Sequence, residues 1–406
     1  MICQSLSNND KRGMYVNTLT NIFYLTNTMP IYLDCNATTP VDPEVESVFL
    51  HFVREEFGNA GSRTHEFGTR AKQAVQRARD QVAGVVKCQR EEVIFTSGAT
   101  ESNNLAILGL RAHGEKAGRK HIVATAIEHK AVLEPLEYLE ANGFTVTLLK
   151  PESDGAVSAA TVAAALRPDT LLVSVMQVNN ETGVIQPIED IAKALAKHEA
   201  FLHVDAAQGF GKRIHELQNR RIDLISISGH KIFAPKGIGA LVTRRRGYER
   251  PPLLPLVFGG GQERGLRPGT LPVALIVALG KAAELALCNC EKRNARCAVI
   301  KKEALAAFDQ VGGVPTGDVA TTLPSTLNIA VPGLDSEAVM LALKDLVAIS
   351  NGSACTSQNY TASHVLTAMG LSEERVKGAL RFSWCHLTPK VDWVAVVDTI
   401  KKMGGL

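Results

Sequence analysis

The sequence has little net charge, few aromatic residues and no long uninterrupted run of apolar residues. Its 44 Lys and Arg residues nearly balance 41 Asp and Glu residues, which leaves a net charge of +3 over 406 residues. That balance gives no indication of binding to nucleic acid or to a membrane surface. No stretch approaches the roughly 20 continuous apolar residues of a membrane span, so we expect no membrane partner. With 45% hydrophobic and 21% charged residues, the chain is typical of a globular protein long enough for two domains.

Two nucleotide-binding motifs and two targeting signals are also missing. There is no G-x-x-x-x-G-K-[ST] segment, which excludes a P-loop, and no G-x-G-x-x-G follows the first strand-like run, which weighs against a dinucleotide-binding fold. The first 28 residues lack the apolar core of a signal peptide and the Arg-rich pattern of a transit peptide. We therefore expect residues 1–28 to be a dispensable leader and the protein to be cytoplasmic.

The chain has eight cysteines and no secretory signal, which indicates reduced thiols rather than disulfides. Cys288, Cys290 and Cys297 resemble part of a metal site. Their segment is typical of a helix, where residues two apart point in different directions, and no fourth ligand is near. We expect no bound metal, while a sulfur- or metal-carrying scaffold built on these three cysteines stays open as an alternative.

From residue 90 onward, short apolar runs alternate with helical segments. Continuous Val, Ile and Leu runs of this kind indicate a largely parallel sheet with helices on both faces. After about residue 272 the pattern changes to one long helix over 272–310, followed by the strand-like segments STLNIAV, VAIS and ALRFSW. We predict an α/β protein with a large domain over 46–271 and a smaller α+β domain over 272–406, to which residues 29–45 contribute an N-terminal segment.

Polar side chains follow several of the predicted strands. In open α/β sheets, ligands bind at the carboxyl ends of the strands. Lys231 interrupts the apolar runs ISIS and IGAL, and a lysine held there either pairs with a charge or has a chemical use, such as forming a Schiff base. The polar residues at the predicted strand ends are Ser97, Thr100, Glu128, His129, Asn179, Asn180, Glu181, Asp205, Gln208, Ser228, His230 and Lys231.

The segment TSGATESNN places small residues between a strand and a helix. Gly98 and Ala99 allow backbone N–H groups to approach a ligand, and a helix N-terminus favours an anion, so a phosphate could be held there together with Thr100. A plain helix cap by Ser97 or Thr100 explains the segment equally well.

Asp205 ends an apolar strand, and a buried carboxylate persists when it meets a cation. The protonated nitrogen of a pyridine ring would be such a cation. With Lys231 as the Schiff-base former, this is the pairing that pyridoxal phosphate requires. A simple salt bridge between Asp205 and Lys231 in a non-enzyme is the alternative, and it leaves the other polar residues without roles.

Segments spread over residues 30–390 resemble, in collinear order, the motifs of cysteine desulfurases of the IscS/NifS type. These enzymes are class V members of the fold-type I pyridoxal-phosphate enzymes. The resemblance implies a homodimer that converts L-cysteine to L-alanine and hands the sulfur to a protein acceptor. The matching segments are SGATESNN, AIEHKAVLEP, VNNETGVIQP, HVDAAQ, SISGHKIFAPKGIGAL, RPGTLP, NGSACTS and ALRFS.

The resemblance also implies roles around the cofactor, pyridoxal 5′-phosphate. Lys231 would bind it as a Schiff base and then move protons at the substrate Cα, although Lys236 competes for this role on sequence alone. His129 would lie over the pyridine ring and assist proton transfer. Asp205 would pair with the ring nitrogen, and Gln208 would donate to its phenolic oxygen. The phosphate would be held by Ala99, Thr100, Ser228, His230 and Thr270, the last reaching the site of the neighbouring subunit.

Substrate binding and sulfur transfer involve three further residues. Arg381 is the candidate partner for the substrate α-carboxylate, because a guanidinium can bind a carboxylate through two hydrogen bonds. Asn180 would provide a second contact. Cys355 lies among small and polar residues in SNGSACTS, an environment that suits a thiolate nucleophile on an accessible loop of the small domain. It would attack the substrate sulfur and carry the persulfide, whereas Cys35 is expected to be structural.

One segment departs from the family pattern: RFSWCH, with Cys385 and His386, stands where typical members have a Gly-Arg pair. GNAGSRTHEFG and RPGTLP resemble the DndA-like branch that serves DNA phosphorothioation, and a desulfurase of that branch need not touch DNA. A housekeeping enzyme for iron–sulfur clusters or tRNA thiolation is an alternative. A selenocysteine lyase or an aminotransferase of the same fold is another.

Overall fold

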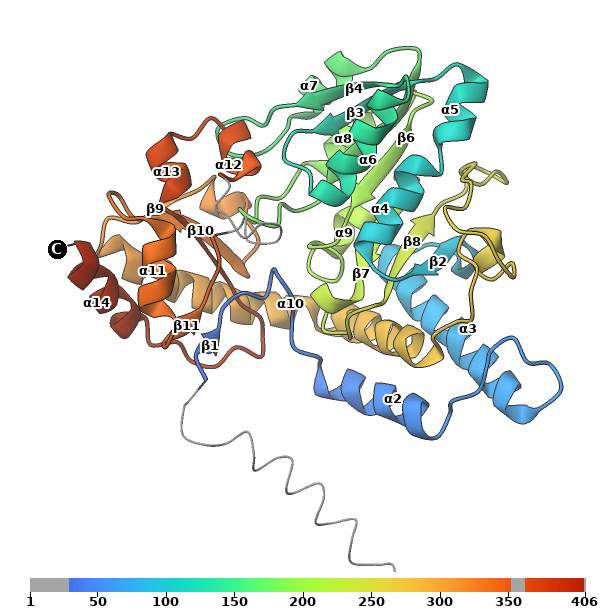
Figure 1. Cartoon of the computed structure of the whole chain (residues 1–406), viewed down its shortest axis with the longest axis horizontal. Helices are drawn as coiled ribbons and strands as arrows, with labels where there is room; N and C mark the ends of the chain where they lie inside the picture. Colours follow the sequence, from blue (N-terminus) through green and yellow to red (C-terminus); the bar gives the residue numbers. More distant parts are fainter. Residues whose placement is uncertain (1–28, 352–361, 405–406) are drawn as a thin grey trace, which may run out of the picture.

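The computed structural model describes residues 29–351 and 362–404. A seven-stranded sheet forms the larger part (Figure 1), in the order β2-β8-β7-β6-β5-β3-β4. All neighbouring strands from β7 to β4 are parallel, and β8 is antiparallel to both β7 and β2. The strands are β2 (Val93–Thr96), β3 (His121–Thr125), β4 (Thr145–Leu149), β5 (Thr170–Met176), β6 (Phe201–Asp205), β7 (Leu224–Ser228) and β8 (Gly239–Thr243).

Helices cover both faces of this sheet, and each face has its own core. On one face α4 (Ala99–Leu108) and α6 (Lys130–Ala141) bury Leu105 and Leu136 against β3 and β5. α5 (Arg111–Ala117) connects α4 to β3. The other face is covered by α3 (Glu66–Val86), α7 (Ala159–Ala165), α8 (Ile188–Ala194) and α9 (Ile214–Leu217).

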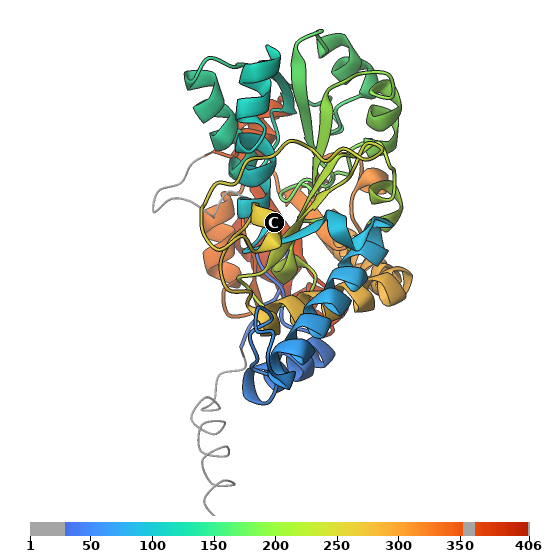
Figure 2. The same cartoon turned by 90° about the vertical axis from the view of Figure 1, so that its right-hand side faces the viewer.

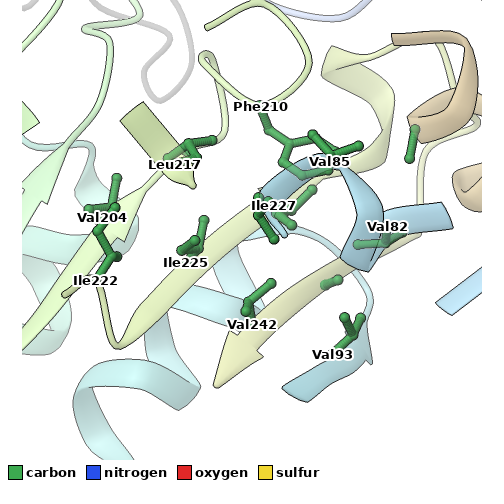
Figure 3. Close-up of a cluster of buried hydrophobic side chains, with 14 of the residues drawn as sticks. Val82, Val85, Val93, Val204, Phe210, Leu217, Ile222, Ile225, Ile227 and Val242 are labelled. Atoms are coloured by element: carbon green, nitrogen blue, oxygen red, sulfur yellow. The ribbon is translucent and has the colours of Figure 1, made fainter. Parts of the chain in front are cut away.

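Side chains alternate along the strands, as a sheet buried on both faces requires. Leu224 of β7 faces the α4–α6 core, whereas Ile225 and Ile227 of the same strand belong to the opposite core. Figure 3 shows this second core, where Ile225, Ile227 and Val242 of the sheet lie beside Val82 and Val85 of α3.

A helix of 37 residues, α10 (Val273–Asp309), runs beneath both parts of the molecule (Figures 1 and 2). It packs against α3 and α2 (Pro43–Arg54). By length and composition, α10 could cross a membrane. The sequence did not predict this, because Lys281 and Glu284 interrupt the apolar run of the helix. Half of its most apolar 18-residue window is buried within the protein, as in a core helix.

The smaller part contains a three-stranded antiparallel sheet in the order β12-β10-β9 and a parallel pair, β1 and β11. Its core joins these strands to α11, α14 and the second half of α10. Its elements are β1 (Ile31–Tyr32), β9 (Val314–Pro315), β10 (Thr326–Ala330), α11 (Ser336–Leu343), β11 (Val347–Ala348), α12 (His364–Ala368), α13 (Glu373–Lys377), β12 (Ala379–Ser383) and α14 (Trp393–Gly404).

Four short 3-10 helices complete the described elements: η1 (Arg90–Glu92), η2 (Gly229–Lys231), η3 (Glu263–Gly265) and η4 (Val319–Thr321). The predicted α/β class with a mainly parallel sheet is confirmed. The antiparallel direction of β8 was not predicted, because apolar patterning does not encode strand direction. Since α10 contributes to both cores, the division of the chain at residue 272 stays a prediction.

Candidate active site

A cavity of about 490 Å³ lies at the carboxyl ends of the parallel strands, where the large sheet faces the small one. Strand ends of the large sheet supply one wall and the first turn of α4 supplies another. Asn36, Ala37 and Arg381 enter from the small sheet and its N-terminal segment. Ten of the predicted site residues line this cavity: Ala99, Thr100, His129, Asn180, Asp205, Gln208, Ser228, His230, Lys231 and Arg381.

Lys231 ends η2, directly after β7, and its side chain reaches across to the N-terminal segment. Its ammonium group donates to the main-chain carbonyl of Ala37, with 2.7 Å between the two atoms, and also to the carbonyl of Asn36. Gly229 begins the turn that aims Lys231 inward, and a Cβ there would lie 2.8 Å from the carbonyl oxygen of Ile238. The sequence therefore needs glycine at this position to deliver the amine into the cavity.

Asp205, at the end of β6, is fixed by two donors. One carboxylate oxygen accepts from the side-chain amide of Asn103 at 2.7 Å, and the other accepts from the main-chain N–H of Ala207 at 2.9 Å. Asn103 is 1% exposed and projects from α4. The Asp205 carboxylate is thus buried and held in one orientation, as a partner for a cationic ring nitrogen should be.

His129 precedes α6 and caps it, because its Nδ1 accepts from the main-chain N–H of Ala131 at 3.0 Å. An acceptor Nδ1 leaves the proton of the neutral ring on Nε2. The ring opens onto the cavity. Desolvation lowers the pKa of His129 and outweighs the opposing charge of Asp205, and the charge of Lys231 lowers this pKa as well. A neutral imidazole at this position can accept or return a proton.

Four of the lining residues suit a phosphate group. Ala99 and Thr100 form the first turn of α4, Ser228 ends β7, and all three line the cavity with His230. The Nδ1 of His230 lies 3.1 Å from the hydroxyl of Thr38. Burial, with the nearby charge of Lys231, lowers the pKa of His230 to about 4, so this residue is a neutral hydrogen-bonding group at pH 7.

Arg381 of β12 closes the cavity on the side of the small sheet and is only 3% exposed. Its guanidinium donates to the Asp34 carboxylate at 2.7 Å and to the main-chain carbonyl of Asn180 at 3.1 Å. Among the described residues its buried Nε has no hydrogen-bond partner, which leaves a donor for an incoming carboxylate. Gln208 donates its amide to the carbonyl of Asn36 at 2.9 Å.

This set of groups fits pyridoxal 5′-phosphate. The cavity combines an amine that can form a Schiff base, a fixed carboxylate and a helix N-terminus with hydroxyl and imidazole neighbours. Lys236 also lines the cavity, so geometry alone leaves it beside Lys231 as a second amine. Within the described part of the chain, no three His, Cys, Asp or Glu side chains are grouped to hold a metal ion, and this includes Cys288, Cys290 and Cys297.

The structure does not place two of the predicted site residues at the cavity. Thr270 is exposed and outside the cavity lining, and Cys355 lies outside the described residues. The sequence did not predict that the main-chain carbonyls of Asn36 and Ala37 line the cavity, because no side chain signals a carbonyl contact. It also did not predict the role of Asn103. The position of Asn103 inside the quoted motif SGATESNN was the signal that could have identified it.

The chain matches a known enzyme family over most of its length. A family model described as aminotransferase class-V matches residues 31–392. The cysteine desulfurase IscS of Anaeromyxobacter dehalogenans is 45% identical over 356 residues, which is 87% of each chain. The cysteine desulfurase IscS of Shewanella oneidensis is 46% identical over 375 residues, which is 92% of each chain.

Solved structures give the same family. A NifS-like protein, 34% identical, matches with a TM-score of 0.85 over 93% of this chain and 100% of that chain. DndA from Streptomyces lividans, 52% identical, matches with a TM-score of 0.77 over 87% of this chain and 99% of that one. SspA in complex with cysteine, 36% identical, matches with a TM-score of 0.77 over 89% of this chain and 99% of that one.

Proposed function

Because this chain belongs to the aminotransferase class-V family, and within it to the pyridoxal-phosphate-dependent cysteine desulfurases, we propose that it converts L-cysteine to L-alanine and passes the sulfur to a protein acceptor. The observation that carries this proposal is one cavity that combines Lys231, the fixed carboxylate of Asp205 and the buried Arg381. The family likeness assigns the chemistry, and the cavity supplies the groups that it needs.

When bound, the cofactor draws electrons away from the substrate Cα, which weakens the bond between Cβ and sulfur. Lys231 holds the cofactor and then moves a proton at the substrate Cα. His129, neutral and with its proton on Nε2, assists that transfer. Asp205 keeps the ring nitrogen protonated, because Asn103 and Ala207 hold its carboxylate in place.

Arg381 binds the α-carboxylate of L-cysteine through its guanidinium, with Asn180 beside it. Its Nε, which has no partner in the part of the chain that the structure describes, supports this role, since a buried donor of this kind gains a hydrogen bond when a carboxylate arrives. Gln208 positions the cofactor's phenolic oxygen, and Ala99, Thr100, Ser228 and His230 hold its phosphate.

Cys355 supplies the nucleophile. Its thiolate attacks the substrate sulfur, the new S–S bond forms as the Cβ–S bond breaks, and the carbon product takes up protons to become L-alanine. The persulfide on Cys355 then passes to the acceptor protein. In the experiment that tests this step, Cys355→Ser abolishes alanine production and sulfide release, while the bound cofactor keeps its visible absorbance band.

The matched control is Cys288→Ser, because Cys288 is an exposed cysteine of α10 outside the cavity. This variant should keep full activity. Alanine production that survives in Cys355→Ser would show that the chain is not a desulfurase of this type. An aminotransferase would instead pass the amino group to a 2-oxo acid, turning alanine into pyruvate or cysteine into 3-mercaptopyruvate, and its activity would not depend on Cys355.

We propose that the sulfur serves DNA phosphorothioation. The 52% identity to DndA from Streptomyces lividans supports this branch, compared with 45–46% to the IscS relatives above. The chain would act in the cytoplasm through a protein acceptor and would not contact DNA itself. Delivery of sulfur for iron–sulfur clusters or tRNA thiolation is the alternative that the IscS relatives favour. Trapping the acceptor on the Cys355 persulfide distinguishes these pathways.

A homodimer with shared sites is the assembly that we propose. A segment near Thr270 exposes several large apolar side chains, with Phe258 87%, Leu254 55% and Val257 54% exposed, and such a patch suits a protein interface. Thr270 would reach the phosphate site of the second subunit from there. Light scattering should give twice the chain mass, and Thr270→Ala should weaken cofactor binding without changing that mass.

A further inference from the structure

Two cysteines that the proposed mechanism does not use lie in contact behind the cavity wall. Cys35 and Cys385 form one buried apolar cluster with Phe233, and the two cysteines are 3% and 5% exposed. Asp34 and Ser383 are bridged as in a parallel sheet, and the main-chain N–H of Cys35 donates to the carbonyl of Ser383 at 3.0 Å. This pairing fixes the two cysteine segments side by side.

The two thiols interact directly. A hydrogen bond joins the thiols, and it holds the pKa of Cys385 below its ordinary value and that of Cys35 above it. The Thr388 hydroxyl also donates to the sulfur of Cys385, 3.8 Å away, and the nearby main-chain N–H groups of Leu387 and Thr388 lower the pKa of Cys385 further. These donors favour a thiolate on Cys385, which is the reactive form of a cysteine.

A lysine faces the same cluster. Burial lowers the pKa of Lys212, and among the described residues Cys35, Cys297 and Cys385 are the groups that oppose that shift. Lys212 is half-buried, and a thiolate in this cluster would stabilise its positive charge. Lys212 also approaches the amide oxygen of Gln208, 3.4 Å away, so the cluster is connected to the cavity.

We propose that Cys35 and Cys385 form a redox modification site, which a small hydroperoxide oxidises to a disulfide. The Cys385 thiolate attacks one peroxide oxygen, the O–O bond breaks, and water or an alcohol leaves with a proton. The Cys35 sulfur then attacks the sulfenic acid on Cys385, so that the S–S bond forms as the S–O bond breaks and water leaves. The thiols together lose two electrons and two protons, and the hydroperoxide is reduced.

The disulfide would act on both walls of the cavity. Cys35 directly precedes Asn36 and Ala37, whose carbonyls accept from Lys231, and Cys385 follows the strand that carries Arg381. Phe233, which belongs to the same cluster, lies two residues after Lys231. A new S–S bond therefore changes the surroundings of the cofactor-binding lysine. Only this consequence rests on the proposed function, and formation of the disulfide does not.

The test uses the holoenzyme with Cys355→Ser, which removes the proposed nucleophile as a competing target of peroxide. The protein is treated with hydrogen peroxide near stoichiometry, alkylated under denaturing conditions and digested without reductant. Mass spectrometry should find the Cys35 peptide joined to the Cys385 peptide, and dithiothreitol should release it. Adding Cys35→Ala or Cys385→Ala should abolish this species, whereas Cys88→Ala, at a half-buried cysteine elsewhere, should not.

Peroxide that modifies only Cys288 or Cys290, with Cys35 and Cys385 recovered as free thiols, would overturn the proposal. The coupling to Lys231 has its own measurement, the visible absorbance band of the bound cofactor. In the Cys355→Ser holoenzyme, peroxide should shift or weaken this band and dithiothreitol should restore it, with no response in Cys35→Ala. A disulfide that leaves the band unchanged would overturn the coupling.

Discussion

The ammonium group of Lys231 donates to the main-chain carbonyl of Ala37 across 2.7 Å, which joins the end of a large-sheet strand to the segment that leads from the small sheet. The lysine side chain is thereby aimed into the cavity from one side and held from the other. Lys231 and Ala37, whose contact positions the reactive amine, are 194 residues apart in the sequence.

Lys231→Ala should abolish covalent attachment of the cofactor. Borohydride reduction of the wild-type holoenzyme should add the mass of reduced cofactor to the peptide that contains Lys231, and the variant should carry none. Lys236→Ala is the matched control, because Lys236 lines the same cavity and should leave the label in place. Label recovered on Lys236 would contradict the assignment.

Asn103→Ala should slow turnover by roughly 10- to 100-fold, because a buried hydrogen bond to a charged group contributes about 1.5–3 kcal/mol. Asn103 acts as a positioning residue through Asp205, so the visible absorbance band of the bound cofactor should also shift while KM changes little. Asn104→Ala, one position along the same helix, should leave both the band and kcat near wild type. Equal losses in the two variants would indicate a merely structural effect.

Arg381→Lys should raise KM for cysteine by roughly 100-fold, since a lysine cannot form paired hydrogen bonds to a carboxylate and the loss of a buried charged contact costs about 3 kcal/mol. The value of kcat should change less. Arg375→Lys serves as the control, because Arg375 donates to the carbonyl of Pro315 outside the cavity. An unchanged KM in Arg381→Lys would remove Arg381 from substrate binding.

Glu128 makes stability depend on pH. Burial raises the pKa of this carboxyl from about 4.5 to about 8. Because the folded state holds the proton more strongly than the unfolded state, the contribution of the neutral acid is full below pH 4.5. That contribution is lost as the pH rises through 8.

Glu128→Gln should remove this dependence, since the amide oxygen can still accept from Thr125 and from the main-chain N–H of Met176. Between pH 5 and pH 9 the unfolding free energy of the wild type should fall relative to the variant by on the order of a few kcal/mol. Urea unfolding at several pH values measures this. Glu134→Gln, at an exposed position on the next helix, should follow the wild type. Parallel profiles for all three proteins would refute the assignment.

Much of the fold and of the cavity lining could be predicted from the sequence, because each depends on local patterns of apolar and polar residues. Apolar runs mark buried strands, and polar residues directly after parallel strands must meet at one edge of the sheet, which is why Asp205 and Lys231 line the same cavity. The carbonyls of Asn36 and Ala37 could not be predicted, because every residue has a carbonyl and the contact joins distant segments. The pairing of Cys35 with Cys385 escaped notice for the same reason, since neither segment alone signals a partner.

The helix shared by both cores has a mechanical consequence. Val273 and Ile276 anchor its first half under the large sheet, and Ile300 and Phe308 anchor its second half under the small one. If either part of the molecule unfolded, apolar side chains of the other part would become exposed to water. Denaturation should therefore proceed in a single cooperative step. Any opening of the cavity must accordingly bend or tilt α10, a continuous helix of about 55 Å. The two parts of the molecule cannot move apart as they would if a flexible linker joined them.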